Sequence, residues 1–191
     1  MPKINFTPFP SLTTERLTLR QLKDTDDFAI FSLRSDASVN KYIDRPTSTT
    51  INEAKQFIIK IHDGIKQNKS IYWVVCLQDD PSLIGTICLW NFSNDKACAE
   101  LGYELNPSSQ GKGLMDEALK SVINYSFHAL GLNTIEAYTH KDNVGSTRML
   151  VKNKFKHAPD RIDLDNSNNL IYYLNNTNHI KNPVLTKPKL H

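Results

Sequence analysis

A short loop with two glycines joins a strand pattern to a helix pattern, and this arrangement limits the fold more than any other feature of the chain. Residues 97–105 (ACAELGYEL) alternate as a strand does, residues 106–113 (NPSSQGKG) form the loop, and residues 114–130 have helical apolar spacing. Such a loop presents backbone N–H groups at the positive end of a helix dipole. Gly111 and Gly113 lack a Cβ and would let a ligand approach the backbone. The segment therefore predicts an anion site suited to phosphate or pyrophosphate.

Two common phosphate-binding loops are excluded by the residues present. The dinucleotide-binding GxGxxG motif would need glycine at the position of Asp116. A P-loop needs Gly-Lys followed by Ser or Thr, whereas Lys112 is followed by Gly113. A lone Gly-x-Gly before a helix is a weak signal, so other motifs are needed to identify the ligand.

Hydrophobic periodicity predicts further strands and helices on both sides of this segment. We expect strands at 16–21, 71–77, 83–90, 134–139, 161–165 and 170–174, and helices at 24–35, 51–68 and 144–153. The second helix begins with a capping-box pattern formed by Thr50 and Glu53. Phe28 in the first helix is expected in the core. The order of elements fits a single α/β domain over residues 1–174, with helices on both faces of a sheet, followed by a polar, weakly basic tail at 175–191.

Composition and charge argue against several classes of protein. The 191 residues carry a formal net charge of +3, which the three lysines of the tail account for, so the body lacks the basic surface of a nucleic-acid binder. No apolar run approaches the ~18 residues of a membrane-spanning helix, and the N-terminus lacks the apolar segment of a signal peptide. Three cysteines without a CxxC pair are typical of reduced thiols in a cytoplasmic protein. No His, Cys and Asp cluster has metal-ligand spacing, so no metal is expected.

Four short motifs carry a resemblance to a known family. The sequence QGKGLM at 110–115 resembles the acetyl-CoA pyrophosphate loop, Gln/Arg-x-x-Gly-x-Gly/Ala, of the GNAT N-acetyltransferases. AELGY at 99–103, NVGS at 143–146 and TERLTLR at 14–20 resemble motifs of the branch that acetylates the N-termini of ribosomal proteins, the RimJ/RimL-like enzymes. The four motifs follow the family's order, and the resemblance covers about residues 11–174.

The resemblance implies the topology of the sheet, and the chain differs from the family pattern at two residues. It implies a mixed, mostly antiparallel central sheet, splayed between strands 97–105 and 134–139, with helices on both faces. Met115 stands where the family has a small residue. Lys154 stands where the family usually has glycine before the Phe that follows the last helix, so a non-glycine residue must adopt the helix-ending conformation.

The resemblance also implies acetyl-CoA as co-substrate and indicates where it binds. The splayed end of the strand would leave the backbone of Tyr103 and Leu105 free to pair with the pantetheine arm, as an added strand would. Asn143 would hydrogen-bond that arm or cap the last helix, and Ser146 lies in the same motif. The residues expected at the pyrophosphate are Gln110, Gly111, Lys112, Gly113, Leu114 and Met115.

Acetyl transfer to an amine requires a neutral amine, donors for the oxyanion and a proton or hydrogen bond for the leaving thiolate. We expect Glu100 to be the general base and Ser146 to serve the thiolate, although Glu100 could equally be a structural carboxylate. Glu104 lies on the same strand face and is the second candidate base, and two close carboxylates could raise one pKa. Tyr138 is a weaker alternative as an acid, because a core-packing role is favoured for it. His140 is a weaker alternative as a base, because a lone loop histidine is typically solvated.

The favoured acceptor is a protein N-terminal α-amine. Its pKa near ~8 leaves roughly one molecule in ten neutral at pH 7, far more than for lysine, so a weak base suffices. Transfer would occur by direct attack in a ternary complex. A small amine, such as a polyamine or an antibiotic, is a second hypothesis, and a catalytically silent acyl-CoA-binding module is a third. The chain is expected to be a monomer or homodimer with neither nucleic-acid nor membrane partners.

Overall fold

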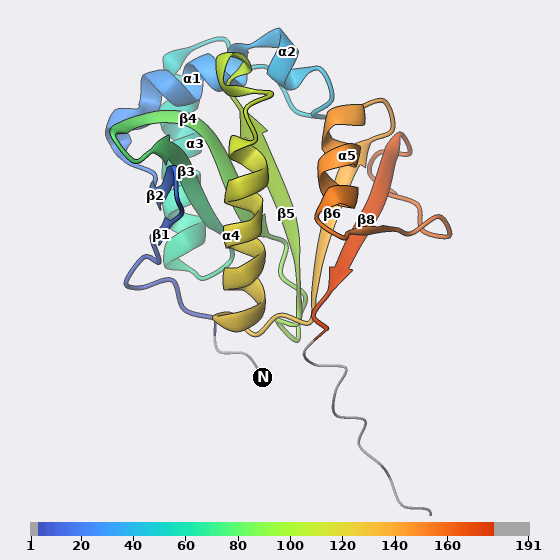
Figure 1. Cartoon of the computed structure of the whole chain (residues 1–191). Coiled ribbons are helices and arrows are strands. Elements are labelled where there is room, and N and C mark those ends of the chain that lie inside the picture. Colours follow the sequence, from blue (N-terminus) through green and yellow to red (C-terminus); the bar gives the residue numbers. More distant parts are fainter. Residues whose placement is uncertain (1–3, 178–191) are drawn as a thin grey trace, which may run out of the picture.

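The computed structural model describes residues 4–177, which form one eight-stranded sheet with helices around it (Figure 1). The strands are β1 (Leu12–Thr13), β2 (Leu17–Gln21), β3 (Ile71–Leu77), β4 (Asp80–Trp90), β5 (Cys98–Leu105), β6 (Thr134–His140), β7 (Lys156–His157) and β8 (Asn169–Asn175). The helices are α1 (Asp27–Ser35), α2 (Ala37–Asn40), α3 (Ile51–Lys66), α4 (Leu114–His128) and α5 (Val144–Lys152), with 3-10 turns η1 (Asp24–Asp26) and η2 (Pro107–Ser109).

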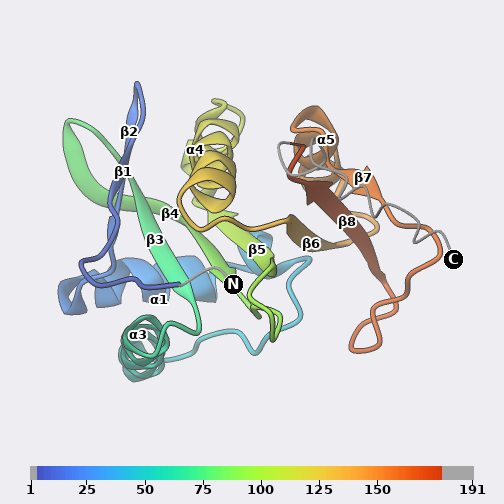
Figure 2. The same cartoon turned by 90° about the horizontal axis from the view of Figure 1, so that it is seen from below.

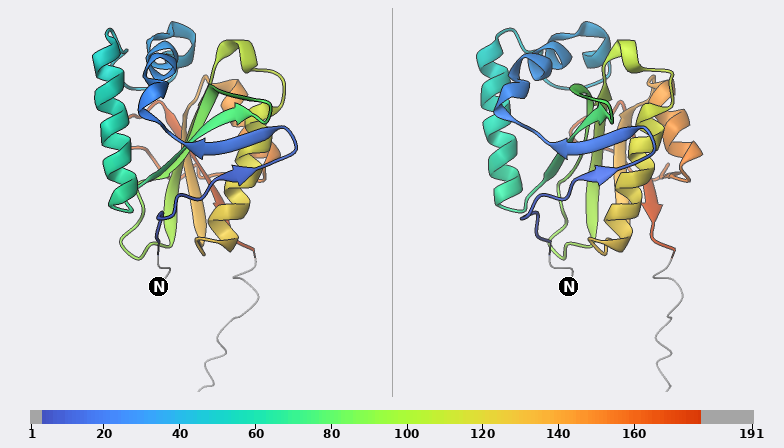
Figure 3. Two further views of the ribbon diagram at one scale, coloured as in Figure 1. Left: turned by 90° about the vertical axis from the view of Figure 1, so that its left-hand side faces the viewer. Right: turned by 60° about the vertical axis from the view of Figure 1, so that its left-hand side comes forward.

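Helices lie on both faces of the sheet. In Figure 2, α4 and α5 lie on one face, and α1 and α3 lie on the other. Figure 3 shows the same layering from the side of β2, with α3 and α4 on opposite sides of the strands. The core fills both layers, since β3 buries all but one of its residues and side chains of α3 and α4 cover it. The predicted α/β class with helices on both faces is confirmed.

The sheet opens between β5 and β6, as predicted. The strand order is β1-β2-β3-β4-β5-β6-β8-β7, and every neighbouring pair is antiparallel except β5 with β6. β5 pairs with β6 only from Cys98 to Leu101, whereas it stays paired with β4 as far as Leu105. Beyond Leu101 the two strands diverge and leave a V-shaped opening in the sheet (Figure 1).

Local sequence signals explain several helix ends. Thr50 accepts from the N–H of Glu53 and the Glu53 carboxylate accepts from the N–H of Thr50, which confirms the capping box. Lys154 has φ +69°, so the residue in place of the usual glycine does adopt the left-handed conformation. The prediction for Phe28 is wrong: it is 70% exposed, because α1 packs through Ile30 and Leu33 instead.

The C-terminal strands differ from the prediction. Residues 161–165, the predicted hairpin partner of the last strand, form no strand; β8 pairs with β7 on one side and with β6 on the other. β8 inserts between β6 and β7 and runs to Asn175, one residue past the predicted end of the domain. Of the predicted tail at 175–191, residues 178–191 lie outside the described residues.

Candidate active site

The glycine loop has the geometry of an anion site. Gly111 and Gly113 have φ +72° and +74°, a conformation that glycine adopts without strain. Gly113 is the N-cap residue of α4 and offers no side chain to the first-turn N–H groups. The Gln110 amide donates to the carbonyl of Leu105 (2.9 Å) and so ties the loop to the end of β5. These N–H groups therefore remain available to an anion beside the open end of the strand.

Leu114 and Met115 have buried side chains, 6% and 7% exposed, within the core. Met115, which replaces the family's small residue, therefore places its side chain in the core. Leu114 and Met115 can each bind a ligand only through the backbone N–H. Lys112 is exposed and directs its carbonyl to Arg16.

Asp116 and Glu117 in the first turn of α4 would repel an anion if they were unpaired, but both form ion pairs with neighbouring cations. Asp116 accepts from Lys152 (2.8 Å) and Lys120 (3.0 Å), and despite its partial burial these bonds lower the pKa of its carboxyl to about 2. Glu117 is paired with Arg16 at 2.6 Å. The negative charges near the loop are therefore neutralised by neighbouring cations.

Arg16 is a site residue that the sequence analysis did not assign. Its Nη1 donates to the Lys112 carbonyl (3.1 Å), and its Nη2 lies 3.7 Å from where a Cβ of Gly113 would stand. The guanidinium is half exposed beside the loop, where it neutralises Glu117 and keeps N–H donors close to the anion site. The TERL motif at 14–17 was the available signal, but only the folded chain brings that strand to α4.

The backbones of Tyr103 and Leu105 face the opening in the sheet. The N–H of Asn106, an even-numbered residue, donates to the carbonyl of Ile84 on the β4 side (2.8 Å). The carbonyl of Ala97, an odd-numbered residue, accepts from the N–H of Thr134 on the β6 side (3.1 Å). Backbone groups of successive strand residues point to alternate sides, and β5 pairs with β4 without a bulge. Odd-numbered residues of β5 therefore point toward β6, and past the last β5–β6 pair Tyr103 and Leu105 have no strand beside them in the described chain.

Tyr103 and Ser146 meet across the opening on the face of α4 and α5. Their hydroxyl oxygens are 2.7 Å apart, and burial raises the pKa of Tyr103 to about 12, so the phenol stays protonated. Asn143 is the N-cap of α5 and accepts from the N–H of Ser146 (3.1 Å). The capping role of Asn143 is therefore confirmed, and its position places Ser146 at the start of the helix.

Glu100 lies on the opposite face of β5, and its surroundings favour the neutral carboxyl. Burial raises the pKa of Glu100 to about 7, and the nearby carboxylates of Asp163, Glu136 and Asp165 add to the rise. A hydrogen bond from Asn91 Nδ2 (3.4 Å) opposes it. A carboxylate with this pKa can accept a proton from an amine near neutral pH.

The other candidate groups are bound to neighbours. Glu104, 8% exposed in its side chain, forms an ion pair with Arg45 at 2.6 Å. The Tyr138 hydroxyl donates to Glu136 (3.1 Å). The His140 ring stacks on the ring of Tyr42, with 5.5 Å between the ring centroids, and its Nδ1 accepts from the N–H of Asp142. The expectation of a solvated ring is therefore wrong. Of the two predicted bases, Glu100 is therefore the one without an ion-pair partner in the described chain.

The site thus has two sides that meet at the opening between β5 and β6. At one side lie the glycine loop, the part of β5 beyond Leu101 that has no strand beside it in the described chain, and the Tyr103–Ser146 pair; Glu100 lies at the other. A thioester laid along β5 could be attacked through the opening from the side of Glu100. This arrangement suits direct transfer of an acyl group to a nucleophile.

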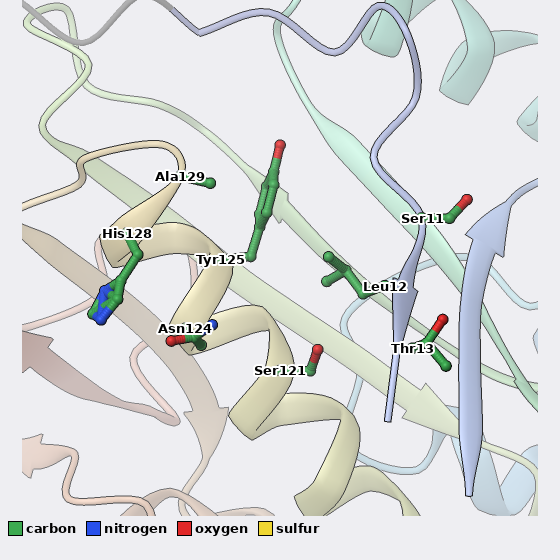
Figure 4. Close-up of a pocket in the computed structure, with 8 residues that line it drawn as sticks. All are labelled: Ser11, Leu12, Thr13, Ser121, Asn124, Tyr125, His128 and Ala129. Atoms are coloured by element: carbon green, nitrogen blue, oxygen red, sulfur yellow. The ribbon is translucent and has the colours of Figure 1, made fainter. Parts of the chain in front are cut away.

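A separate depression lies away from these residues. It has a volume of about 300 Å³ and lies between β1 and the C-terminal half of α4, lined by residues that include Leu12, Tyr125 and His128 (Figure 4). None of the predicted site residues lines it. Among residues 4–177, no three His, Cys, Asp or Glu side chains are placed to hold a metal ion, and no helix has the length and apolarity to span a membrane.

Comparison with known families agrees with this geometry. The fold is an α/β protein with a mixed sheet split beside a glycine loop, and residues 16–156 match the sequence model of the family described as Acetyltransferase (GNAT) domain. The chain belongs to the GNAT acetyltransferase family. It is an N-acetyltransferase, as its curated relatives are named.

Relatives span most of the chain. The uncharacterized N-acetyltransferase YoaA of Bacillus subtilis is 35% identical over 148 residues, 78% of this chain and 84% of that protein. The [ribosomal protein uS5]-alanine N-acetyltransferase of Escherichia coli is 28% identical over 173 residues, 83% of this chain and 86% of that protein. A solved structure of RimL, a ribosomal alpha-N-protein acetyltransferase in complex with coenzyme A, has a TM-score of 0.76 at 16% identity, covering 87% of this chain and 98% of that one.

Proposed function

We propose that this N-acetyltransferase moves the acetyl group of acetyl-CoA to a protein N-terminal α-amine by direct attack in a ternary complex. The observation that carries the proposal is Glu100, a partly buried carboxyl with a pKa of about 7 on the face of the sheet opposite the coenzyme loop. An α-amine has a pKa near ~8, so proton transfer to Glu100 is uphill by roughly one pKa unit. A lysine amine would add more than two further units.

The coenzyme would bind from the side of α4 and α5. Its pyrophosphate would lie on the N–H groups of residues 110–115, with Arg16 beside it, and its pantetheine arm would pair with the backbone of Tyr103 and Leu105. Support comes from the coenzyme A bound in the RimL structure of the same fold. The Tyr103–Ser146 hydroxyl pair would donate a hydrogen bond or proton to the leaving thiolate.

The E. coli relative named for a ribosomal-protein alanine supports an N-terminal acceptor. A second acceptor class, a small polyamine, is favoured by a different observation, the carboxylates of Asp163, Glu136 and Asp165 close to Glu100. We further propose that the predicted domain, extended to Asn175 by β8, acts as one acetyltransferase unit, that the protein works in the cytoplasm and that it does so as a monomer or homodimer.

An acceptor panel tests the proposal. Release of free thiol from acetyl-CoA is followed with a peptide that begins with alanine, the same peptide N-acetylated but carrying an internal lysine, spermidine, and no acceptor. We expect thiol release with the free peptide, and mass spectrometry should place the acetyl group on its α-nitrogen. Turnover with spermidine alone would move the acceptor to a polyamine, and no turnover with any amine would contradict the proposed function.

A further inference from the structure

Trp90 is a half-exposed aromatic residue at the end of β4, opposite Glu100 in the sheet. The protein has two tryptophans: Trp73 is fully buried, whereas Trp90, the last residue of β4, is 46% exposed. Single exposed apolar residues are common on protein surfaces, so exposure alone means little. The neighbours of Trp90 are what make its position informative.

Two observations place the indole on the face of Glu100. Trp90 is the register partner of Glu100 in the β4–β5 pair, and directly opposed residues present their side chains on the same face. The indole Nε1 lies 3.9 Å from the point where a Cβ of Gly102 would stand, and Gly102 lies between Glu100 and Glu104 on that face. The ring therefore lies beside the bare backbone between the two carboxylates.

The end of β4 presents two different groups near the same carboxyl. Asn91, which has φ +48°, directs its Nδ2 to Glu100 Oε2 at 3.4 Å. Trp90 adds an apolar, electron-rich ring that remains partly open to solvent. An amine bound at Glu100 on this face would therefore lie near the ring.

We propose that Trp90 is an acceptor-binding residue, whose indole receives the amine in its protonated form beside Glu100. The proposal rests on the proposed function, since it takes Glu100 as the base. A cation attracted to the face of an indole is a favourable contact, strongest for tryptophan among the aromatic residues. Proton transfer then breaks an N–H bond of the ammonium and forms an O–H bond on Glu100, and the electron pair left on nitrogen forms the N–C bond to the thioester carbonyl. The C–S bond breaks as the carbonyl re-forms, the leaving thiolate accepts a hydrogen bond from the Tyr103–Ser146 pair, and the second proton lost by the nitrogen neutralises the thiolate.

Kinetics of Trp90→Leu test the proposal, with Phe28→Leu as the matched control because Phe28 is another exposed aromatic residue, on α1. With the alanine peptide we expect the acceptor KM to rise roughly fivefold or more at pH 6.5, and the rise to shrink at pH 9, where most of the amine is neutral. The KM for acetyl-CoA should stay within about twofold, and Trp90→Phe should recover part of the affinity. Phe28→Leu should change neither KM.

Fluorescence provides a readout without turnover. With coenzyme A present, adding the alanine peptide should change the tryptophan emission of the wild type, and Trp90→Phe, which keeps only buried Trp73, should lose that response. The same response in Trp90→Phe, an unchanged acceptor KM in Trp90→Leu, or a KM rise equal at both pH values would overturn the proposal. If the wild type acetylates the peptide while Trp90→Leu matches it, only the role of Trp90 fails; if the wild type acetylates no amine, the proposed function itself fails.

Discussion

At the scale of single residues, Glu100 and Glu104 show how location separates two identical side chains. Both lie on one face of β5, and each is two residues away from Gly102. Arg45 reaches Glu104 from the segment after α2 and forms a buried ion pair, whereas Glu100 has burial and neighbouring carboxylates that raise its pKa to about 7. Glu100 is therefore the group able to take a proton at neutral pH.

The first prediction concerns Glu100→Gln, which keeps the shape and removes the basicity. We expect kcat/KM at pH 7 to fall by ~10²–10⁴-fold, the usual cost of losing a general base. The loss should shrink as the pH rises past ~8, because the α-amine then deprotonates without help. Coenzyme affinity, measured by calorimetry, should not change. Near wild-type rates at pH 7 would exclude Glu100 as the base.

The second prediction concerns Ser146→Ala. Because the thiolate would lose its hydrogen-bond partner, we expect a fall in kcat/KM of about 10- to 100-fold that persists at high pH. Thr147→Val is the matched control, since its buried hydroxyl lies next along α5 and has no hydrogen-bond partner in the described chain. A pH profile from 6 to 9.5 separates Ser146 from Glu100. A loss in Ser146→Ala that vanishes at high pH would contradict a role at the thiolate.

At the scale of elements, α4 has a left-handed glycine next to each end. Gly113 is its N-cap, and Gly131 follows its C-terminus with φ +68°. Neither glycine has a protein atom closer than 3.7 Å to the position of an added Cβ. Substitution at either position therefore strains the backbone in a similar way, and only Gly113 belongs to the proposed coenzyme loop.

The third prediction uses this symmetry. Gly113→Val should raise the dissociation constant of coenzyme A by roughly tenfold or more, because the side chain blocks approach to the N–H groups and the backbone resists φ +74°. Gly131→Val should lower the melting temperature without changing coenzyme affinity. Calorimetric titration of both folded variants decides the matter. Equal coenzyme affinity in wild type and Gly113→Val would remove the loop as the pyrophosphate site.

At the scale of the whole molecule, the split sheet joins two faces with different chemistry. One parallel pair, β5 with β6, holds the two halves together at one end and lets them diverge at the other. In the proposed function, the opening is where the thioester on the side of α4 and α5 would meet an amine on the side of Glu100. The arrangement has a cost in stability, because it keeps the Glu100 carboxyl partly buried without a cationic partner among residues 4–177.

The fourth prediction follows from that cost. The pKa of Glu100 is raised in the folded protein from 4.5 to about 7, so its contribution to stability is present at low pH and is lost as the pH rises through about 7. Glu100→Gln should therefore melt a few degrees higher than wild type at pH 8 and at nearly the same temperature at pH 4. The exposed Glu15→Gln is the control for loss of one charge. A Glu100→Gln variant less stable than wild type at pH 8 would contradict the burial argument.

Features that depend on residue spacing within one element or one turn could be predicted from the sequence. It was enough for the glycine loop before α4, the capping box at Thr50 and the placement of Glu100 and Tyr103 on opposite faces of β5, because backbone geometry fixes these. The motifs added the family and the split sheet. The folded chain was needed to show which glutamate has no ion-pair partner within residues 4–177, that Tyr103 meets Ser146 and that Arg16 lies beside the loop. Each of these depends on contacts between residues far apart in the chain, whose burial and charge no local pattern records.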